Sequence, residues 1–257
     1  ASFSASKVKW ERYGKAGDAE ANNVGLVQAR PFIAKPNDGT TALVVANGVN
    51  SANDQAVLLV YNLETGALIR QISTATGSSS APNGLSGATG WDGDGNGTVD
   101  YVYAGDILGN VWKFDLSAAT SASWSVANSA KPLFTATHPV GTGSTVQAIS
   151  ANMTVALNPS TYDVWLFFGT GRFMTAGDIT DKSVQSLYGI IDTSNATSNA
   201  TLARSALTSR AITVTGAASG YPVRGFQPNA VLPPGSKGWY INLLTPPSTA
   251  QGERIVT

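Results

Sequence analysis

The sequence predicts an all-β fold, and its repeat pattern favours a β-propeller with partial or irregular blades and long loop inserts. Short apolar strands lead through glycine-bearing turns into aromatic-rich strands that end near Asp or Asn. This unit returns at intervals of about 50 to 65 residues, as expected for propeller blades. No useful length of chain shows the 3.6-residue hydrophobic period of an amphipathic helix. A plain β-sandwich, which also uses short strands and glycine turns, is the alternative.

The first predicted blade follows an entry segment at residues 1–23 that has no clear hydrophobic period. Residues 42–46 and 56–61 are continuous apolar runs bounded by polar loops, which is typical of buried strands. The Glu-Thr-Gly sequence at residues 64–66 turns the chain into a third strand at residues 67–72. Strand, turn and strand at this spacing predict an antiparallel meander.

The same pattern recurs along the rest of the chain. Residues 76–90 are rich in Ser, Gly and Pro and predict a loop, and residues 195–219 predict a surface excursion. Further strands are expected in pairs at 101–104 with 111–116, at 164–172 with 186–192, and more weakly at 238–243 with 253–257. Large aromatic side chains on these strands are expected to form blade core rather than a ligand platform: Trp112, Phe114, Trp165, Phe167 and Tyr188.

Residues 92–100, with the sequence DGDGNGTVD, have the spacing of a calcium loop. Oxygen-bearing side chains occupy loop positions 1, 3, 5 and 9, and Gly97 occupies position 6, as at the start of an EF-hand loop. Calcium prefers oxygen ligands, and glycines allow a tight loop to turn alternate side chains inward. We therefore expect one Ca²⁺ to be bound by the side chains of Asp92, Asp94, Asn96 and Asp100 and by the carbonyl of Thr98.

The loop departs from the EF-hand pattern after this point. Position 12 is Tyr103 instead of a bidentate Glu, and residues 99–104 alternate like a strand instead of opening a helix. The sequence thus predicts a calcium loop that leads into a sheet. We expect it to bind calcium with a dissociation constant of about 10⁻⁴ to 10⁻³ M. The alternative is an acidic, glycine-rich surface turn without metal. Three carboxylates within nine residues repel one another unless a cation neutralises them, which favours the metal.

Two other polar groups are candidate ligand sites. Asp178 and Asp181 lie close together in a polar insert, where a second cation is conceivable on the same oxygen-ligand logic. Arg172 lies in a glycine-flanked turn, and we expect it to satisfy neighbouring loop carbonyls or an Asp rather than to bind a partner's carboxylate.

Composition excludes several classes of function. The 257 residues include no Cys and a single His, His138, which excludes metal or nucleophile chemistry built on those side chains. A net charge of zero without a Lys/Arg cluster argues against a nucleic-acid partner, and no apolar run reaches the roughly 18 residues of a membrane span.

Abundant Ser, Thr, Gly, Ala and Asn are common in secreted and surface proteins. The chain begins without Met and ends within a predicted strand, so we expect it to be a piece of a longer parent chain.

Several collinear segments resemble the C-terminal propeller domain of the PilY/PilC family, the type IV pilus tip-associated adhesins and biogenesis factors of bacteria. Besides the loop at 92–100, they are NGVNS at 47–51, NGLS at 83–86, DYVYAGD at 100–106, GNVWKFDL at 109–116, FGTGRF at 168–173, QSLYGI at 185–190, and KGWY at 237–240 with GER at 252–254. They occur in the family's order and cover most of residues 25–257.

The resemblance implies a modified, quinoprotein-like propeller without catalytic activity that binds one calcium ion through a surface loop. The family's ligands correspond to Asp92, Asp94, Asn96, Thr98 through its carbonyl, and Asp100, with Asn96 in place of a more usual aspartate. It also implies roles in pilus biogenesis, twitching motility and adhesion at the cell surface. The implied partners are minor pilins of the pilus tip, a host-surface receptor and the remainder of the parent chain. The sequence contains no Arg-Gly-Asp tripeptide, so integrin binding has no motif support.

An enzyme of the quinoprotein class is the alternative function. Residues 57–62, followed by the turn at 64–66, also resemble the propeller repeats of oxidoreductases that use pyrroloquinoline quinone (PQQ). Those enzymes hold calcium beside the quinone with residues from several blades, whereas the acidic cluster of this chain is local. A bound quinone would colour the protein, so an absorption spectrum distinguishes the two functions.

Overall fold

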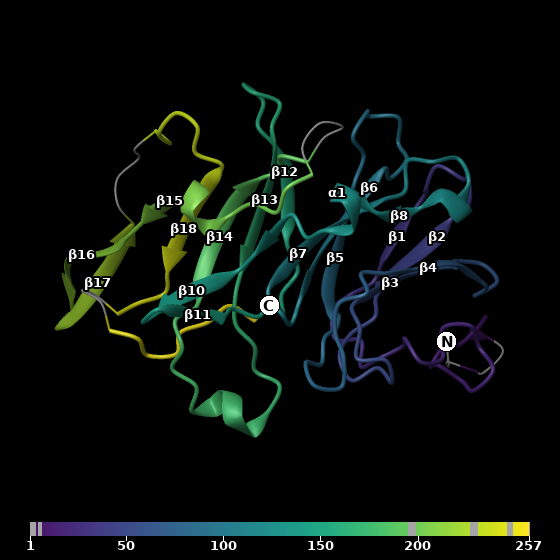
Figure 1. Cartoon of the computed structure of the whole chain (residues 1–257), viewed down its shortest axis with the longest axis horizontal. Coiled ribbons are helices and arrows are strands. Elements are labelled where there is room, and N and C mark those ends of the chain that lie inside the picture. Colours follow the sequence, from purple (N-terminus) through teal and green to yellow (C-terminus); the bar gives the residue numbers. More distant parts are fainter. Residues whose placement is uncertain (1–3, 5–6, 195–198, 227–230, 246–248, 257) are drawn as a thin grey trace. The chain divides into compact units, whose positions relative to one another are not determined.

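The computed structural model describes residue 4 and residues 7–194, 199–226, 231–245 and 249–256. Strands make up most of the regular structure (Figure 1). The chain divides into two compact units, one formed by Ala1–Asp106 with Trp112–Lys131 and the other by Ile107–Val111 with Pro132–Thr257. In the part of the chain that is described, no helix has the length and apolar character needed to cross a membrane.

The first unit begins with a four-stranded antiparallel sheet in the order β1-β2-β3-β4. Its strands are β1 (Phe32–Ala34), β2 (Ala42–Ala46), β3 (Val57–Asn62) and β4 (Leu68–Ser73). The predicted meander is therefore confirmed. Alternate residues of β3 belong to two different hydrophobic clusters, which explains why this strand is apolar throughout.

The second sheet contains β5 (Leu85–Trp91), β6 (Tyr101–Asp106), β7 (Asn110–Asp115) and β8 (Ser125–Val126), and β9 (Phe134–Thr135) pairs with β7. The prediction of a loop at residues 76–90 was wrong in its second half, because β5 pairs antiparallel with β6 there. The small residues of β5 carry no apolar pattern, but they permit close packing. A Cβ at Gly90 would lie 2.8 Å from the ring of Phe32.

Buried aromatic side chains fill the core of the first unit. Trp112, Phe114 and Trp124 are almost fully buried in one cluster with the apolar residues of β2, β3 and β6. The predicted core positions of Trp112 and Phe114 are thus confirmed. The fully buried Asp106 accepts 2.8 Å hydrogen bonds from Trp112 Nε1 and from Asn83 Nδ2 on the same carboxylate oxygen. These bonds offset part of the cost of burying a carboxylate.

The second unit contains a five-stranded sheet in the order β12-β13-β14-β18-β15. Its strands are β12 (Thr154–Leu157), β13 (Val164–Gly169), β14 (Ser186–Ile191), β15 (Thr208–Arg210) and β18 (Gly238–Asn242). The strand predicted at 238–243 is confirmed as β18, but its predicted partner was wrong. It pairs with β14 and β15, and residues 253–256 form no strand, while Thr257 lies outside the described residues.

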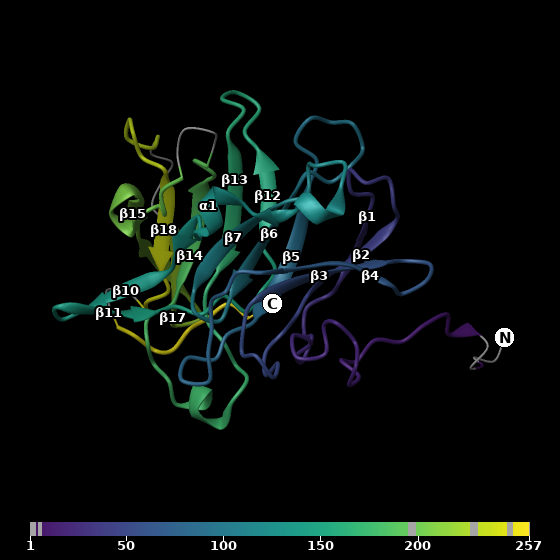
Figure 2. The same ribbon diagram turned by 45° about the vertical axis from the view of Figure 1, so that its right-hand side comes forward.

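Two hairpins complete the strands of this unit. One is formed by β10 (Thr137–Val140) with β11 (Gly143–Val146) (Figure 2). The other is formed by β16 (Ile212–Ala218) with β17 (Tyr221–Phe226) (Figure 1). The excursion predicted at residues 195–219 therefore contains β15 and β16, and residues 195–198 lie outside the described part of the chain. The part of the chain that is described includes the short helical segments η2 (Ser121–Ser123), α1 (Ala127–Ala130), η3 (Ala176–Ile179) and η4 (Arg204–Ala206).

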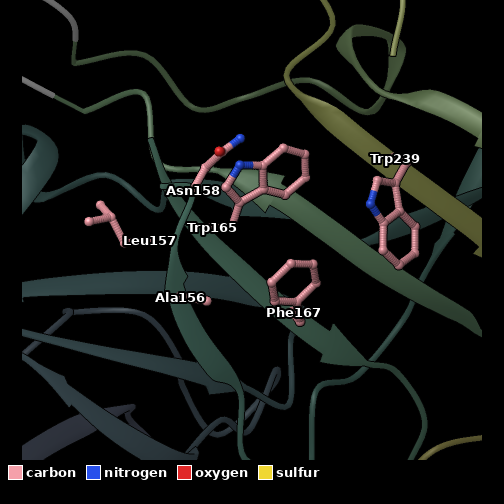
Figure 3. Close-up of a pocket in the computed structure, with 6 residues that line it drawn as sticks. All are labelled: Ala156, Leu157, Asn158, Trp165, Phe167 and Trp239. Atoms are coloured by element: carbon pink, nitrogen blue, oxygen red, sulfur yellow. The ribbon is translucent and has the colours of Figure 1, made fainter. Parts of the chain in front are cut away.

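Two aromatic residues predicted to be blade core, Trp165 and Phe167, instead line an aromatic groove on one face of the five-stranded sheet. Tyr188 is fully buried as expected, whereas Trp165 and Phe167 are only partly buried. Their rings lie nearly parallel, with centroids 5.8 Å apart. Figure 3 shows them with Trp239 and the other residues of the groove, which are Ala156, Leu157 and Asn158. Gly189 makes room for the Trp239 indole, because a Cβ there would lie 2.6 Å from that ring.

Candidate metal site

The predicted calcium loop connects two paired strands of the first unit. Trp91 at the end of β5 pairs with Tyr101 at the start of β6, and Asp100 N donates a 3.0 Å hydrogen bond to Trp91 O. Strand pairing therefore brings the two ends of the loop together. Within the loop, Gly95 and Gly97 have φ values of 78° and 87°, a region that glycine enters without the steric penalty of a side chain.

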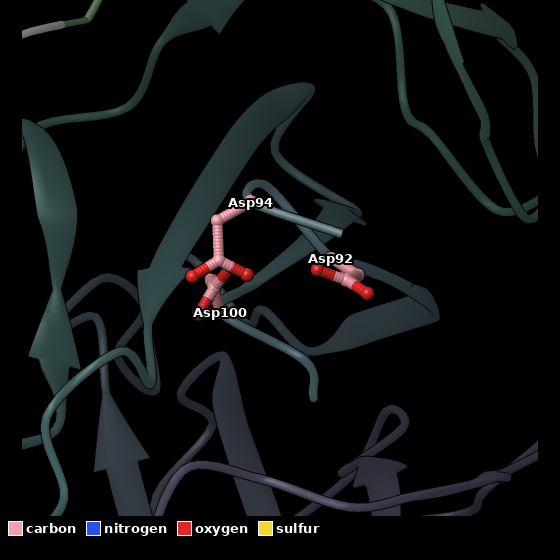
Figure 4. A group of neighbouring side chains, drawn as sticks. All are labelled: Asp92, Asp94 and Asp100. Carbon is pink, nitrogen blue, oxygen red and sulfur yellow. The ribbon is translucent and has the colours of Figure 1, made fainter. Parts of the chain in front are cut away.

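The three carboxylates of the loop converge on one point. Asp92, Asp94 and Asp100 each offer one oxygen, and these oxygens lie within 4.8 Å of one another (Figure 4). Calcium binds oxygens at 2.3–2.6 Å, so two ligands on opposite sides of one ion are at most about 4.6 to 5.2 Å apart. The spacing of the three carboxylates therefore fits a single calcium ion.

Backbone N–H groups fix the carboxylate of Asp92. Its Oδ1 accepts hydrogen bonds from Gly95 N at 2.7 Å and Asn96 N at 3.2 Å, and its Oδ2 accepts one from Gly97 N at 2.8 Å. The bond from Gly97 is the largest cause that lowers the pKa of the Asp92 carboxyl from its ordinary value. The loop thus favours the ionised form of this group, which is the form that a carboxylate must take to bind a cation.

The exposed middle of the loop carries three of the predicted ligand residues. Asn96 Nδ2 donates to Asp94 Oδ2 at 2.9 Å, and Asn96 Oδ1 accepts from Thr98 N at 2.7 Å. Thr98 Oγ1 also donates to Asn96 Oδ1, so both lone pairs of this amide oxygen are used, and a cation bound there would replace one of the two bonds. The structure brings all five predicted residues into one loop, and the carboxylates form its centre.

Asp100 anchors the buried side of the site. Its side chain is 7% exposed, and its Oδ2 accepts a 2.8 Å hydrogen bond from Gly93 N. Its Oδ1 accepts a 2.9 Å bond from Nδ2 of Asn37, which lies in the turn between β1 and β2. Sequence reasoning missed Asn37 because the pair is 63 residues apart and the turn at residues 36–39 carries no sign of this contact.

The second acidic group has a structural role. Asp178 is 3% exposed and forms a 2.9 Å ion pair with Arg172, as expected for that arginine. Asp178 also accepts hydrogen bonds from Met174 N at 2.9 Å and Thr175 N at 2.8 Å. Burial raises the pKa of Asp178, but these bonds outweigh it and leave the pKa well below the ordinary value. What distinguishes Asp178 from the carboxylates of the loop at 92–100 is that Arg172 balances its negative charge.

Comparison with known proteins agrees with this architecture. The family model described as the PilY1 beta-propeller domain matches residues 8–215. The chain belongs to the PilY1 β-propeller family. The predicted all-β propeller with irregular blades is thereby confirmed, as is the resemblance drawn from the sequence motifs.

Relatives of the PilY1 family are matched over most of the chain. A type IV pilus biogenesis factor PilY1 homolog of Xylella fastidiosa is 38% identical over 93% of this chain. The type IV pilus biogenesis factor PilY1 of Pseudomonas aeruginosa strain PAO1 is 35% identical over 72% of this chain. The crystal structure of the Pseudomonas aeruginosa PilY1 C-terminal domain covers 92% of this chain with a TM-score of 0.79 and 29% identity.

The chain corresponds to a small part of these relatives. It spans 18% of the Xylella protein, 17% of the Pseudomonas protein and 54% of the solved C-terminal domain. The match is therefore to the propeller portion of pilus biogenesis factors that are several times longer.

Proposed function

We propose that this chain is a non-enzymatic, calcium-binding propeller module of a type IV pilus-associated protein. The observation that carries the proposal is the convergence of three carboxylate oxygens within 4.8 Å on one loop of a PilY1-family propeller. Ca²⁺ held by Asp92, Asp94 and Asp100, with oxygens of Asn96 and Thr98, neutralises charges that otherwise repel one another.

Calcium occupancy then acts as a local switch. Without the ion, repulsion among the carboxylates favours opening of the exposed loop, and with the ion the loop is held closed. We propose that this transition regulates pilus biogenesis, twitching motility and surface adhesion. The proposed partners are minor pilins at the pilus tip and a host-surface receptor, and the proposed location is the bacterial cell surface. The type IV pilus biogenesis factors among the relatives support this assignment.

Isothermal titration of calcium into the chelator-stripped protein tests the ion site. We expect one site with a dissociation constant of about 10⁻⁴ to 10⁻³ M, because the loop lacks the bidentate Glu of an EF-hand. The Asp92→Ala variant should lose the binding heat. Asp181→Asn is the matched control, since it removes an exposed loop carboxylate that hydrogen-bonds Ser183 outside the cluster. Calcium binding of unchanged affinity in Asp92→Ala would show that the site is elsewhere.

The pilus role is tested in a bacterium that carries the parent gene. Replacing Asp92 by Ala should abolish the response of twitching motility to calcium while the protein is still produced at parental levels. Motility that responds to calcium as in the parent strain would contradict the regulatory role, even if the isolated chain binds the ion.

A further inference from the structure

Asn37 lies in the β1–β2 turn, and its side chain contacts the calcium loop at several points. Its Nδ2 group lies 2.9 Å from Asp100 Oδ1, 3.3 Å from Leu116 O and 3.4 Å from Val99 O. Its Oδ1 lies 3.0 Å from Thr98 Oγ1, whose single proton is shared between Asn37 Oδ1 and Asn96 Oδ1, which is 2.5 Å away. The donor bond to Asp100 is the shortest and goes to a carboxylate, which makes it the strongest of the four.

The backbone reinforces this contact. Val99 N donates a 2.9 Å hydrogen bond to Lys35 O, and Pro36 forms a parallel bridge with Val99. Leu116, after the end of β7, donates from its N to Asp100 O at 2.7 Å. The last three residues of the loop are thus joined to the β1–β2 turn of one sheet and to the end of β7 in the other.

We propose that Asn37 is a positioning residue that couples calcium binding in the loop at residues 92–100 to the β1–β2 turn. By holding Asp100 Oδ1 and Thr98 Oγ1 at once, Asn37 sets the position of the two proposed ligand residues at the end of the loop. Calcium then stabilises the junction of the two sheets within the first unit, and not the loop alone. This inference rests on the calcium binding proposed above.

An amide suits this position better than a carboxylate does. The side chain donates to Asp100 Oδ1 and places an acceptor beside the Thr98 hydroxyl, and an amide does both, whereas an ionised Asp cannot donate. A fourth carboxylate beside Asp100 would also add repulsion to the cluster. Residues outside the direct ligands that orient them commonly change metal affinity by about 10- to 100-fold.

Calcium titration combined with hydrogen exchange tests the proposal. In the parent, calcium should increase the protection of amides in residues 35–40 as well as in residues 92–100. Asn37→Ala should bind one calcium with roughly 10- to 100-fold lower affinity. At saturating calcium it should keep protection in the loop but lose the increase at residues 35–40. Asn62→Ala is the matched control, because Asn62 braces the β3–β4 turn through Glu64 N and Thr65 N without touching the loop.

Thr98→Val supplies a second test that keeps the backbone carbonyl of the proposed ligand. It removes the hydroxyl that contacts both Asn37 and Asn96, so it should weaken calcium binding through either contact. The loss of calcium-dependent protection at residues 35–40 is the result that reports on the contact with Asn37. The double variant should lose less affinity than the sum of the two single losses, because both single changes break the same contact.

The outcomes separate the two proposals. If the parent binds calcium but Asn37→Ala matches Asn62→Ala in affinity and protection, the positioning role is wrong and the ion site stands. If the parent binds no calcium, the proposed function itself fails. A loss of protection in Asn37→Ala that is equal with and without calcium would indicate a structural contact only, and would also overturn the coupling.

Discussion

The backbone N–H of Gly97 donates a 2.8 Å hydrogen bond to Oδ2 of Asp92, the first carboxylate of the loop. Gly97 has a φ of 87°, which places this N–H toward the carboxylate in a conformation that other residues rarely adopt. The loop is therefore organised by its own backbone around the ionised Asp92.

Gly97→Ala should weaken calcium binding through backbone strain. No atom lies within 4 Å of a Cβ built at this position, so the change adds no collision with neighbouring residues. The left-handed conformation costs a residue with a side chain about 1–2 kcal/mol, and a fall of roughly tenfold in calcium affinity is expected. Titration calorimetry measures the calcium affinity of the variant. Gly216→Ala is the control, since its Cβ also meets no atom within 4 Å. Equal affinities in the two variants would contradict the role of Gly97.

Asp178 should stabilise the protein except in strong acid. Its folded-state pKa is lowered, so its contribution is present above the ordinary carboxyl pKa and is lost as the pH falls through the lower folded value. Asp178→Ala should lower the free energy of unfolding by about 1–3 kcal/mol near neutral pH, because it leaves the part-buried N–H groups of Met174 and Thr175 and the Arg172 guanidinium without this acceptor. The difference should shrink below pH about 4. Denaturant titrations at a series of pH values measure the difference in free energy of unfolding between the parent and the variant. A difference that stays constant into strong acid would contradict the role of the ionised Asp178.

Trp112→Phe should destabilise the first unit by more than the smaller size of phenylalanine explains. The indole N–H donates to the buried Asp106 carboxylate at 2.8 Å, and phenylalanine removes that donor. The expected loss is about 1–3 kcal/mol in the free energy of unfolding. Trp239→Phe, at a half-exposed position in the aromatic groove, is the comparison and should cost less. The reverse order of stability by chemical denaturation would contradict the importance of the Asp106 contact.

Gly189→Ala should displace the Trp239 ring from the aromatic groove. The new Cβ would lie 2.6 Å from Trp239, and overpacking of this kind costs about 1–3 kcal/mol unless the neighbour moves. Because Trp239 is half-exposed, we expect it to move and to become more accessible. Quenching of tryptophan fluorescence by iodide should increase, and unchanged quenching with unchanged stability would contradict the close contact.

Elements with strong local patterns were predictable from the sequence, and elements made by distant pairing were not. Strands β2 and β3 are apolar runs between turns, so their type and order could be inferred directly. Strand β5 consists mainly of small residues and exists because β6 pairs with it, which no local preference indicates. Strand β18 was predicted correctly. Its parallel partner β15 could not be deduced, because the β16–β17 hairpin separates the two strands along the sequence.

The candidate site divides in the same way. Its five predicted residues follow from spacing within nine consecutive positions, since a loop that short brings its own side chains together. Asn37 reaches the loop only because the β1–β2 turn folds against it, 61 residues from Thr98 and 63 from Asp100. An isolated Asn in a turn normally satisfies its own backbone, so nothing local distinguished it.

A crystal structure of the protein soaked in calcium tests the central claim most directly. We expect one strong peak within 2.3–2.6 Å of oxygens from Asp92, Asp94 and Asp100, and its absence in crystals of Asp92→Ala soaked in the same way. An ordered loop that holds only water at saturating calcium would contradict the assignment of a calcium site to this loop.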